Sequence, residues 1–514
     1  MIFYLVLERI LEYLALEIYN ITAGILHVSS SLEAAMIGRT EEKKYLQSLL
    51  KKNESQFVAV FGRRRIGKTY LVRESFDYHF TFQHTGISSS EIKGSKKKAQ
   101  LERFEKSLAE AGYVSARKIT SWDEAFDGLK EVIRNSTETK KVIFIDELSW
   151  MDTKQSGLIT ALESFWNGWA TARKEKDVIL IVCASATYWM IDKIVNAKGG
   201  LHNRLTGRIY LKPFTLKECE EYLLSENIRL TRHQILQAYM ILGGVPYYWT
   251  FMEKGKSLPQ NIDHMFFEEN AVLEGEYENL YRSLFDSPEQ YIKIIEALSK
   301  VKEGVTREDI AKAAKIPKSG NLSKKLRELE NCGFIRKYVP FGYKEKNTIY
   351  QLIDNYTLFY HQFLKNNPSD EKFWENQFDA GKIHSWSGLA FEKVCLEHIP
   401  QIKAALGITG VSTEVNAWRC SKDTEKGLKG SQIDLLIVRR DQVINVCEMK
   451  FCEDDFEADA AFDSALRRKV SDFMKATKTK SAIHPILITT YGVGDSPYMG
   501  NVQAVITAED LFRI

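Results

Sequence analysis

The sequence predicts an α/β protein whose first half is built around a parallel β-sheet. Short apolar runs alternate with longer helical patterns between residues 37 and 215, and uninterrupted β-branched runs of this length are typical of strands buried on both faces. A glycine-rich loop follows the first run, and a helical pattern follows the loop. The expected strands are Gln56–Phe61, Val142–Ile145, Val178–Cys183 and Ile209–Leu211.

Length and composition indicate an ordinary multidomain globular chain. The 514 residues suggest about three domains, and 44% hydrophobic with 27% charged residues is typical of globular proteins. The net charge of +3 neither requires nor excludes nucleic acid, so binding would depend on local basic patches. Seven cysteines without a CxxC pair fit a reducing cytoplasm and argue against disulfides or structural zinc.

The first residues call for a separate interpretation. Glu8, Arg9, Glu12 and Glu17 interrupt the apolar N-terminal run, so neither a membrane span nor a signal peptide is expected there. A pattern typical of a natural protein start begins at Met36. We therefore interpret residues 1–36 as an N-terminal extension upstream of that start, with a packed amphipathic helix as the alternative.

The remaining chain divides into four predicted segments. A nucleotide-binding α/β core is expected at 37–215 and a helical lid at 216–297. A winged helix with a connector is expected at 298–385. A C-terminal α/β domain is expected at 386–514. The sequence shows no internal repeat and no low-complexity linker, so we expect these domains to pack together.

The loop after the first strand matches the phosphate-binding pattern G-x-x-x-x-G-K-[ST]. Its backbone N–H groups and the following helix N-terminus would hold phosphate oxygens. Lys68 would neutralise the β- and γ-phosphates, and the Thr69 hydroxyl would bind Mg²⁺. The nucleotide is expected to be ATP. The residues predicted to contact it are Gly62, Arg63, Arg64, Arg65, Ile66, Gly67, Lys68, Thr69 and Tyr70.

Two carboxylates follow the next long apolar run. Asp146 and Glu147 stand at the end of the strand Val142–Ile145, where ligands bind in parallel sheets. Asp146 would hold Mg²⁺ through water, and Glu147 would act as the general base for hydrolysis. The alternative is that one of them only caps the next helix.

Three further residues are candidates for contacting the γ-phosphate. Ser185 follows the strand Val178–Cys183. Arg204 and Arg208 come before the last expected strand. Ser185 would sense the phosphate, and an arginine would reach it in the same subunit or from a neighbouring one. The alternatives are an ordinary serine at a strand end and surface arginines.

Several of these segments resemble the AAA+/STAND-type ATPases common in archaea and anaerobic bacteria. The resemblance covers nearly all of the chain from residue 37. It implies that Ser185 is the sensor, that Arg204 matches the arginine of an L-Y-G-R-R-T segment, and that Pro246 lies in the G-x-P turn near the nucleotide. The matching segments are IGR at 37–39, the loop GRRRIGKT, IDELSWM at 145–151, ESFWNGWA at 163–170, LHNRLT at 201–206, LKPF at 211–214 and GGVPYY at 243–248.

The sequence departs from that family in two places. The family's Gly-Ser-Ser is Ala184-Ser185-Ala186 here, and its second arginine is Leu205. If the second arginine is the one that acts on a neighbouring subunit, activation between subunits is in doubt. A homo-oligomer is therefore possible but not required.

The segment after the lid predicts a winged helix. A capped helix begins near Thr306, a second spans about Asn321–Glu330 and ends at Gly333, and residues 334–350 alternate like a β-hairpin. Such a module can contact DNA, or it can be regulatory with its basic residues simply solvated. The predicted DNA-facing residues are Lys318 before the second helix, Lys324, Lys325 and Arg327 on it, and Lys344 and Lys346 on the hairpin.

The C-terminal domain carries a second candidate site. Asp434 lies in one predicted strand, and Glu448 and Lys450 end the next, two residues apart and so on one face. Two carboxylates would hold Mg²⁺ while Lys450 stabilises charge on phosphate or hydroxide. Glu392 in a preceding helix would add a third carboxylate.

This constellation resembles the restriction-endonuclease fold, the PD-(D/E)xK superfamily, whose acids and lysine match Glu392, Asp434, Glu448 and Lys450. The resemblance implies a metal-dependent nuclease-like domain acting on nucleic acid, DNA more than RNA. The alternatives are a surface hairpin with a Glu–Lys pair, or a silent domain that binds a partner in a switch assembling on ATP. The nearby Glu397, His398, Asp454 and Asp455 fit no metal template, and we expect them to be solvated.

Overall fold

The computed structural model describes residues 36–88, 91–197, 199–285, 287–366, 369–377, 381–425 and 428–513. The N-terminal extension predicted for residues 1–36 lies outside the described residues except for Met36. Residues 41–514 form one compact unit. The following description concerns that unit.

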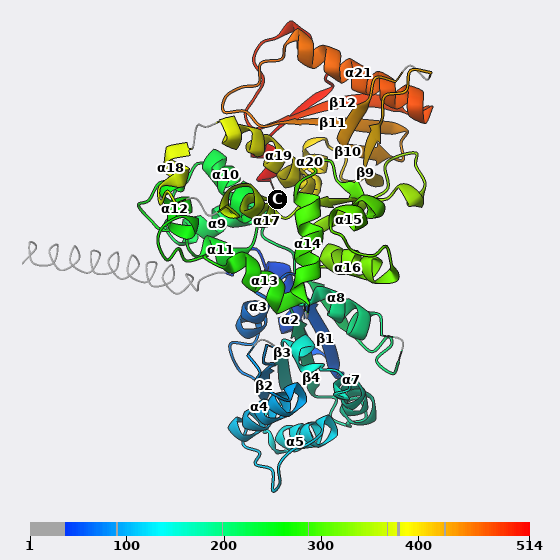
Figure 1. Cartoon of the computed structure of the whole chain (residues 1–514). Coiled ribbons are helices and arrows are strands. Elements are labelled where there is room, and N and C mark those ends of the chain that lie inside the picture. Colours follow the sequence, from blue (N-terminus) through cyan, green and yellow to red (C-terminus); the bar gives the residue numbers. More distant parts are fainter. Residues whose placement is uncertain are drawn as a thin grey trace, which may run out of the picture. The chain divides into compact units, whose positions relative to one another are not determined.

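A five-stranded, all-parallel sheet forms the first part, in the order β2-β3-β4-β1-β5 (Figure 1). Four of its strands confirm the predicted apolar runs, whereas β2 has no such run and was not predicted. The α/β fold class with a parallel sheet is thereby confirmed. The strands are β1 (Gln56–Phe61), β2 (Phe82–Thr85), β3 (Lys141–Asp146), β4 (Val178–Ala184) and β5 (Gly207–Tyr210).

Helices cover this sheet, and one large apolar core lies between them and one of its faces. Phe57, Ala59 and Phe61 of β1 point into this core together with Trp122 and Phe126, as alternation along a strand requires. The helices of this part are α2 (Thr40–Ser48), α3 (Lys68–Ser75), α4 (Lys96–Glu110), α5 (Trp122–Asn135), α6 (Leu148–Met151), α7 (Leu158–Glu163) with its continuation Ser164–Ala170, and α8 (Thr187–Met190) with its continuation Ile191–Val195.

A helical segment follows, as expected for the lid. Thr215, Thr231 and Ser257 begin three of its helices with reciprocal side-chain caps that satisfy the free N–H groups of the first turn. The helices are α9 (Leu216–Ser225), α10 (Arg232–Leu242), α11 (Pro246–Trp249), α12 (Leu258–Phe266) and α13 (Glu276–Leu284).

Three helices and a small sheet come next, in the predicted order of helix, helix and hairpin. Thr306 caps α15 through Asp309, and Gly333 takes the left-handed conformation after α16, with φ of 78°. The sheet order is β6-β8-β7. The elements are α14 (Pro288–Ser299), β6 (Val305–Thr306), α15 (Arg307–Ala313), α16 (Gly320–Asn331), β7 (Ile335–Tyr338) and β8 (Ile349–Leu352). The assignment as a winged helix stays a prediction.

The C-terminal part is a mixed five-stranded sheet in the order β13-β12-β11-β10-β9, with α19 and α21 packed against it. β9, β10 and β11 are antiparallel neighbours, whereas β11, β12 and β13 run parallel. The elements from β8 onward are α17 (Asn355–Phe359), α18 (Phe373–Gln377), α19 (Gly381–Glu397), α20 (Ile399–Ala405), β9 (Thr413–Cys420), β10 (Ser431–Arg439), β11 (Val443–Lys450), α21 (Ala460–Thr477), β12 (Ala482–Thr489), β13 (Ala504–Thr507) and α22 (Ala508–Leu511).

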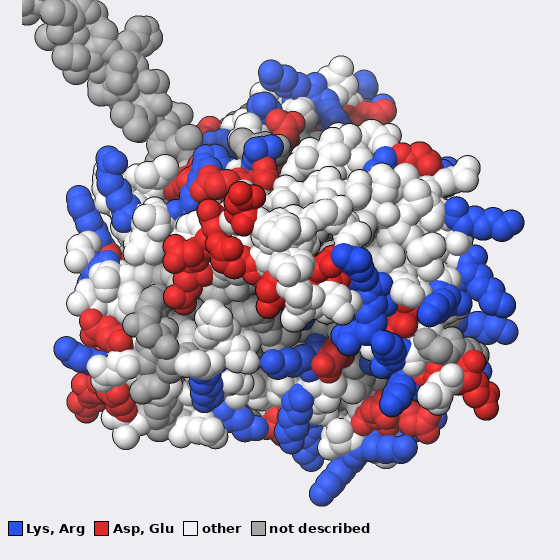
Figure 2. Space-filling view, turned by 90° about the horizontal axis from the view of Figure 1, so that it is seen from above, with Lys and Arg blue, Asp and Glu red and all other residues white. Residues whose placement is uncertain are grey.

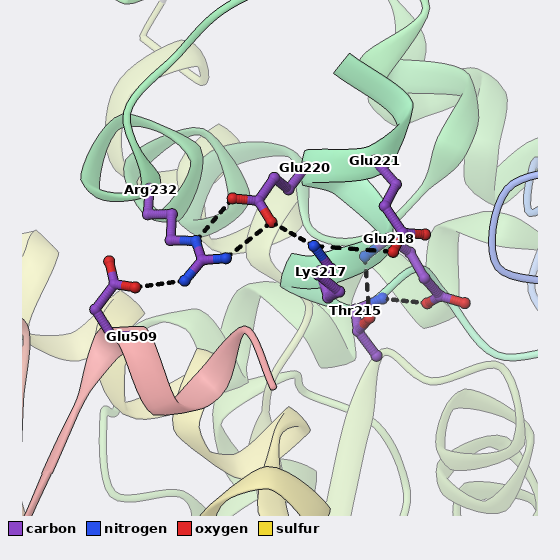
Figure 3. Close-up of polar contacts among 7 residues, drawn as sticks. All are labelled: Thr215, Lys217, Glu218, Glu220, Glu221, Arg232 and Glu509. Atoms are coloured by element: carbon purple, nitrogen blue, oxygen red, sulfur yellow. Dashed lines mark hydrogen bonds and ion pairs between the residues drawn. The ribbon is translucent and has the colours of Figure 1, made fainter. Parts of the chain in front are cut away.

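Polar contacts join this C-terminal part to the helical segment (Figure 3). Arg232 of α10 donates to Glu220 of α9 at 2.7 and 3.1 Å and also pairs with Glu509 of α22. His398 accepts the N–H of Leu216, the first residue of α9, at 3.0 Å. Its other ring nitrogen lies 2.8 Å from the Val394 carbonyl and therefore carries the proton. The expectation that His398 is solvated is wrong, because this residue is 1% exposed.

Two predicted domain boundaries fall inside helices. The boundary at 297/298 lies within α14, and the boundary at 385/386 lies within α19. The first of these helices ends at Ser299 and the second at Glu397, and the division into domains stays a prediction. Within the described part of the chain, no helix is long and apolar enough to cross a membrane.

Candidate nucleotide site and C-terminal carboxylate site

The loop at the end of β1 depends on two glycines. Gly62 has a φ of 147°, and a Cβ there would lie 2.3 Å from the carbonyl oxygen of Leu211. Gly67 has a φ of 84° and directly precedes α3. Side chains at either position would be strained. The loop therefore closes tightly between the strand and the N-terminus of the helix, with Ile66 buried beneath it.

Lys68 lies at the centre of this loop. Its ammonium donates to the carbonyl oxygens of Gly62 and Arg63 at 3.2 and 2.9 Å and to the Ser185 hydroxyl at 3.3 Å. The side chain is buried, and burial lowers the pKa of Lys68. The ammonium is thus held by weak neutral acceptors, which a more strongly bonding anion can replace.

Thr69 and Asp146 bring a hydroxyl and a carboxylate together beside the loop. The Thr69 hydroxyl donates to Asp146 Oδ2 at 2.7 Å. Asp146 is buried at the carboxyl end of β3, and burial, followed by the charge of Glu147, raises the pKa of Asp146. Both groups are hard oxygen donors of the kind that Mg²⁺ prefers, so they fit the cation expected here.

Glu147 is held by Ser185, which confirms that the two residues meet at the same edge of the sheet. Both the backbone N–H, at 3.0 Å, and the hydroxyl of Ser185 donate to the Glu147 carboxylate. Glu147 has a φ of 49°, a costly left-handed conformation for a residue with a side chain. The strained backbone and the two donors fix the carboxylate in one orientation.

Distant parts of the chain hold the loop arginines. Arg63 forms an ion pair with the buried Asp354, which caps α17, and Arg65 pairs with Glu276 at the start of α13. The Arg65 guanidinium also lies 4.1 Å from the ring centre of Tyr247. Sequence reasoning missed Asp354 and Glu276, because no local pattern marks a carboxylate that pairs across more than 200 residues.

Three other predicted contacts surround the loop. The Arg64 guanidinium lies 5.9 Å from the ring centre of Trp150, and Tyr70 is 49% exposed on α3. Pro246 is the first residue of α11, and the following N–H of Tyr247 donates to the Arg65 carbonyl at 3.4 Å. The turn predicted to approach the nucleotide therefore does reach the loop.

The structure corrects the expectation for Arg204. β5 runs parallel to β1, with Val58 opposite Gly207 and Phe61 opposite Tyr210. Arg204 precedes β5, whereas the loop follows β1, so the two lie at opposite ends of the sheet. The expectation that Arg204 contacts the phosphate bound in its own subunit is therefore wrong. A contact with a neighbouring subunit stays a prediction.

A parallel sheet with this loop, a buried lysine and two strand-end carboxylates defines a P-loop nucleotide-binding domain. A family described as an ATPase domain predominantly from Archaea matches residues 36–250. Residues 36–250 are therefore similar to this ATPase domain family, in agreement with the ATPase part of the predicted resemblance. An uncharacterized protein of Methanocaldococcus jannaschii is 25% identical over 406 residues, which cover 78% of this chain and 83% of that relative.

Two solved structures are also similar. The Walker-type ATPase of Pyrococcus abyssi is 16% identical, with 63% of this chain and 96% of that one covered and a TM-score of 0.44. The ORC2 protein of Aeropyrum pernix, in its ADPNP–ADP complexes, is 14% identical, with 63% and 92% covered and a TM-score of 0.39.

The C-terminal carboxylates lie on neighbouring strands. Leu435 pairs with Cys447 and Leu436 with Val446, so Asp434 and Glu448 are next in register. Asp434 accepts a hydrogen bond from Gln432 at 2.6 Å. Lys450 lies 3.1 Å from Glu448, on the same side, as the period of two predicts.

Lysine side chains pair with two of the three carboxylates of the predicted metal site. Glu448 also bonds Lys469 of α21 at 2.6 Å, a residue that sequence reasoning missed. Burial acts to raise the pKa of Glu448, but the charges of Lys469 and Lys450 outweigh it and lower that pKa. Burial and then Asp434 raise the pKa of Glu392. Within the described ranges, no three His, Cys, Asp or Glu side chains form a group able to hold a metal ion. A cation shared by Glu392, Asp434 and Glu448 therefore stays a prediction.

The basic residues of α16 differ in their exposure, because Lys324 and Arg327 are exposed whereas Lys325 is buried. Lys325 is buried over the ring of Tyr291, 4.1 Å from its centre. Arg327 lies 3.7 Å from Asp192 of the ATPase core, and α16 packs against α8. The prediction of a DNA-facing side chain is wrong for Lys325, because its side chain is buried. Arg327 pairs with an aspartate of the same chain. Lys344 and Lys346 on the hairpin are exposed, as predicted.

Proposed function

We propose that this protein binds ATP with Mg²⁺ at the P-loop and hydrolyses it. The observation that carries the proposal is the pairing of Thr69 with Asp146 beside a Glu147 carboxylate that Ser185 orients. A site for nucleotide binding alone has no need of a second, strained carboxylate at the same edge. The matched archaeal ATPase domain supports the same reaction.

Each residue has a role in this proposal. The backbone from Gly62 to Thr69 surrounds the phosphates, and Lys68 exchanges its carbonyl partners for phosphate oxygens. Thr69 and Asp146 would hold Mg²⁺, which when bound neutralises phosphate charge. Glu147 accepts the proton of the attacking water, and Ser185 keeps that carboxylate in place. Asp146 and Glu147 are thus given the predicted roles.

The test is phosphate release from ATP by the purified full-length protein, with and without a chelator. We expect release with excess Mg²⁺ and background release with EDTA, restored when Mg²⁺ is added back. The reason is that Thr69 and Asp146 form an oxygen-donor pair suited to that cation. Equal release in EDTA would contradict the proposed Mg²⁺ contact.

A second proposed function is action on nucleic acid by a winged helix and a nuclease-like C-terminal domain, controlled by the nucleotide state. The register of Asp434 with Glu448 and the position of Lys450 favour it. We propose DNA rather than RNA as the nucleic acid. We also propose that the protein is cytoplasmic. The alternative is a switch that assembles on ATP binding, with a silent domain for a partner. The lysine pair on Glu448 favours this alternative.

Cleavage assays distinguish the proposed nuclease from the proposed partner-binding switch. Wild-type protein is incubated with plasmid and with RNA, with Mg²⁺, Mn²⁺ or EDTA, and with or without ATP. We expect Asp434→Ala to reduce cleavage by roughly 10²–10³-fold, as when one group acting on a reacting centre is removed. The control is Asp441→Ala, which changes an aspartate in the turn at the opposite end of β10 and β11 from Asp434 and Glu448 and should cleave as wild type does. No cleavage under any condition leaves the partner-binding alternative.

A further inference from the structure

A polar cleft lies between the β7–β8 hairpin and the first strands of the C-terminal sheet. Its volume is about 740 Å³. One wall carries Tyr343 and Asn347 of the hairpin, and the other carries Arg419 at the end of β9 and Gln432 at the start of β10. Thr306 lies between the walls. Two parts of the chain more than 70 residues apart therefore form one surface.

The cleft is held open by contacts behind its walls. The N–H of Phe341, next to the hairpin tip, donates to the Ala417 carbonyl of β9 at 2.9 Å. Arg419 donates to the Gly304 carbonyl at 3.3 Å, which orients its guanidinium. Because the hairpin is bonded to the sheet at this edge, the two walls keep a fixed separation.

The chemistry of the cleft suits an anionic ligand with flat rings. Among the described residues that line it, Arg419 is the charged one and none is acidic. Tyr343 is 45% exposed, and the exposed Lys344 and Lys346 flank the hairpin wall. An exposed tyrosine offers a stacking surface for a base, and arginine and lysine hold phosphates. On the face of the molecule in Figure 2, basic and acidic side chains gather in separate groups rather than one continuous basic field.

One lining residue of the cleft contacts a candidate carboxylate. Gln432 pairs with Arg419 across the two strands, and its amide donates to Asp434 at 2.6 Å. A phosphate on Arg419 would therefore lie two side chains from Asp434. The helix α16, by contrast, packs against α8. One basic residue of that helix, Lys325, is buried and does not contribute to an accessible basic surface.

We propose that this cleft binds a single strand of nucleic acid, with a phosphate on Arg419 and a base on Tyr343. The inference rests on the proposed action on nucleic acid and names its substrate class. A volume within the roughly 300–1,000 Å³ of ordinary ligand pockets admits one or two nucleotides of one strand. In a duplex the bases are paired and stacked inside, so none is free to stack on Tyr343.

The test is fluorescence anisotropy of a fluorescein-labelled oligothymidylate with full-length protein in EDTA, so that cleavage plays no part. We expect wild-type protein to bind, and Arg419→Ala to weaken binding about tenfold, or about 1.4 kcal/mol, because the variant loses a charged hydrogen-bond donor to phosphate. Tyr343→Ala should weaken binding by a similar factor, as loss of one stacked base does. An unlabelled duplex of equal length should compete poorly.

Matched variants control for charge and for folding. Arg440→Ala removes an exposed arginine at the other end of β10, and Tyr498→Ala removes a tyrosine of similar exposure, 41%, outside the cleft. Both should bind as wild type does. Tyr343 is exposed, so its variant tests the cleft even if Arg419→Ala disturbs the contact with Gly304. Unchanged melting temperatures of the variants show that the fold is intact.

The outcomes separate this inference from the proposed nuclease. Binding that both cleft variants weaken, without cleavage under any condition, supports the cleft and removes the nuclease. Wild-type affinity in both cleft variants, or no binding of the oligothymidylate by wild-type protein, overturns the cleft whatever the cleavage assay gives. Equal competition by duplex overturns the assignment to a single strand.

Discussion

Replacing Glu147 with glutamine is expected to leave ATP bound and to slow its hydrolysis by about 10²–10⁴-fold, the usual contribution of a general base. Glutamine keeps the size of the side chain, and its single amide oxygen can still accept one of the two hydrogen bonds that the N–H and the hydroxyl of Ser185 donate to the two Glu147 oxygens. It cannot take a proton from water. The Lys68 and Thr69 contacts to phosphate are untouched, so binding should persist.

The measurement is single-turnover phosphate release beside ATP affinity from isothermal titration. Glu110→Gln changes an exposed glutamate at the end of α4 and should behave as wild type does in both assays. A Glu147→Gln protein with unchanged turnover would show that Glu147 is only the residue before α6, the helix-capping alternative. Loss of binding together with turnover would show that the carboxylate is structural.

The parts of the sheet that were predictable are those whose physical cause is local. β1, β3 and β4 are buried along their whole length, and burial on both faces leaves a continuous apolar run in the sequence. β2, with the sequence FQHT, alternates between buried and exposed residues over four positions only. So short an alternation cannot be told from a loop, and this strand becomes visible only through its pairing with β3.

The candidate sites divide in the same way. Lys68 and Thr69 follow from a motif in eight consecutive residues, and Asp146 and Glu147 follow from the end of an apolar run. Asp354 with Arg63, by contrast, depends on the packing of α17 against the loop, which no spacing encodes. The burial of the Lys325 side chain could not be predicted from the sequence either, because a lysine on a helix usually points to solvent.

The C-terminal site shows how a correct pattern can still mislead. The spacing of Asp434, Glu448 and Lys450 predicted two strands in register, and the structure has them. The spacing could not predict Lys469, because this lysine belongs to α21, which follows both strands in the sequence and reaches Glu448 only through packing. A charge that is already paired by two lysines changes what the carboxylate can bind.

Replacing Lys68 with alanine is expected to have the largest effect of all on nucleotide binding. Removing one partner of a buried, hydrogen-bonded charge pair costs roughly 2–5 kcal/mol, so the Kd for ATP should rise by about 30-fold or more. Without nucleotide the effect should be small, because the buried ammonium bonds only two carbonyls and the Ser185 hydroxyl, and burial already lowers its pKa.

This contrast makes thermal melting with and without ATP the sharpest measurement for Lys68→Ala. A ligand at 100 times its Kd stabilises the folded state by about 2.7 kcal/mol, so wild-type protein should melt at a higher temperature with ATP. The Lys68→Ala protein should melt near the wild-type temperature without ATP and show little shift with it. Lys106→Ala, at an exposed position on α4, should keep the full shift. An equal ATP-induced shift in the Lys68 variant would mean that the nucleotide binds elsewhere, because no other ammonium lies against the loop carbonyls within the described hydrogen bonds.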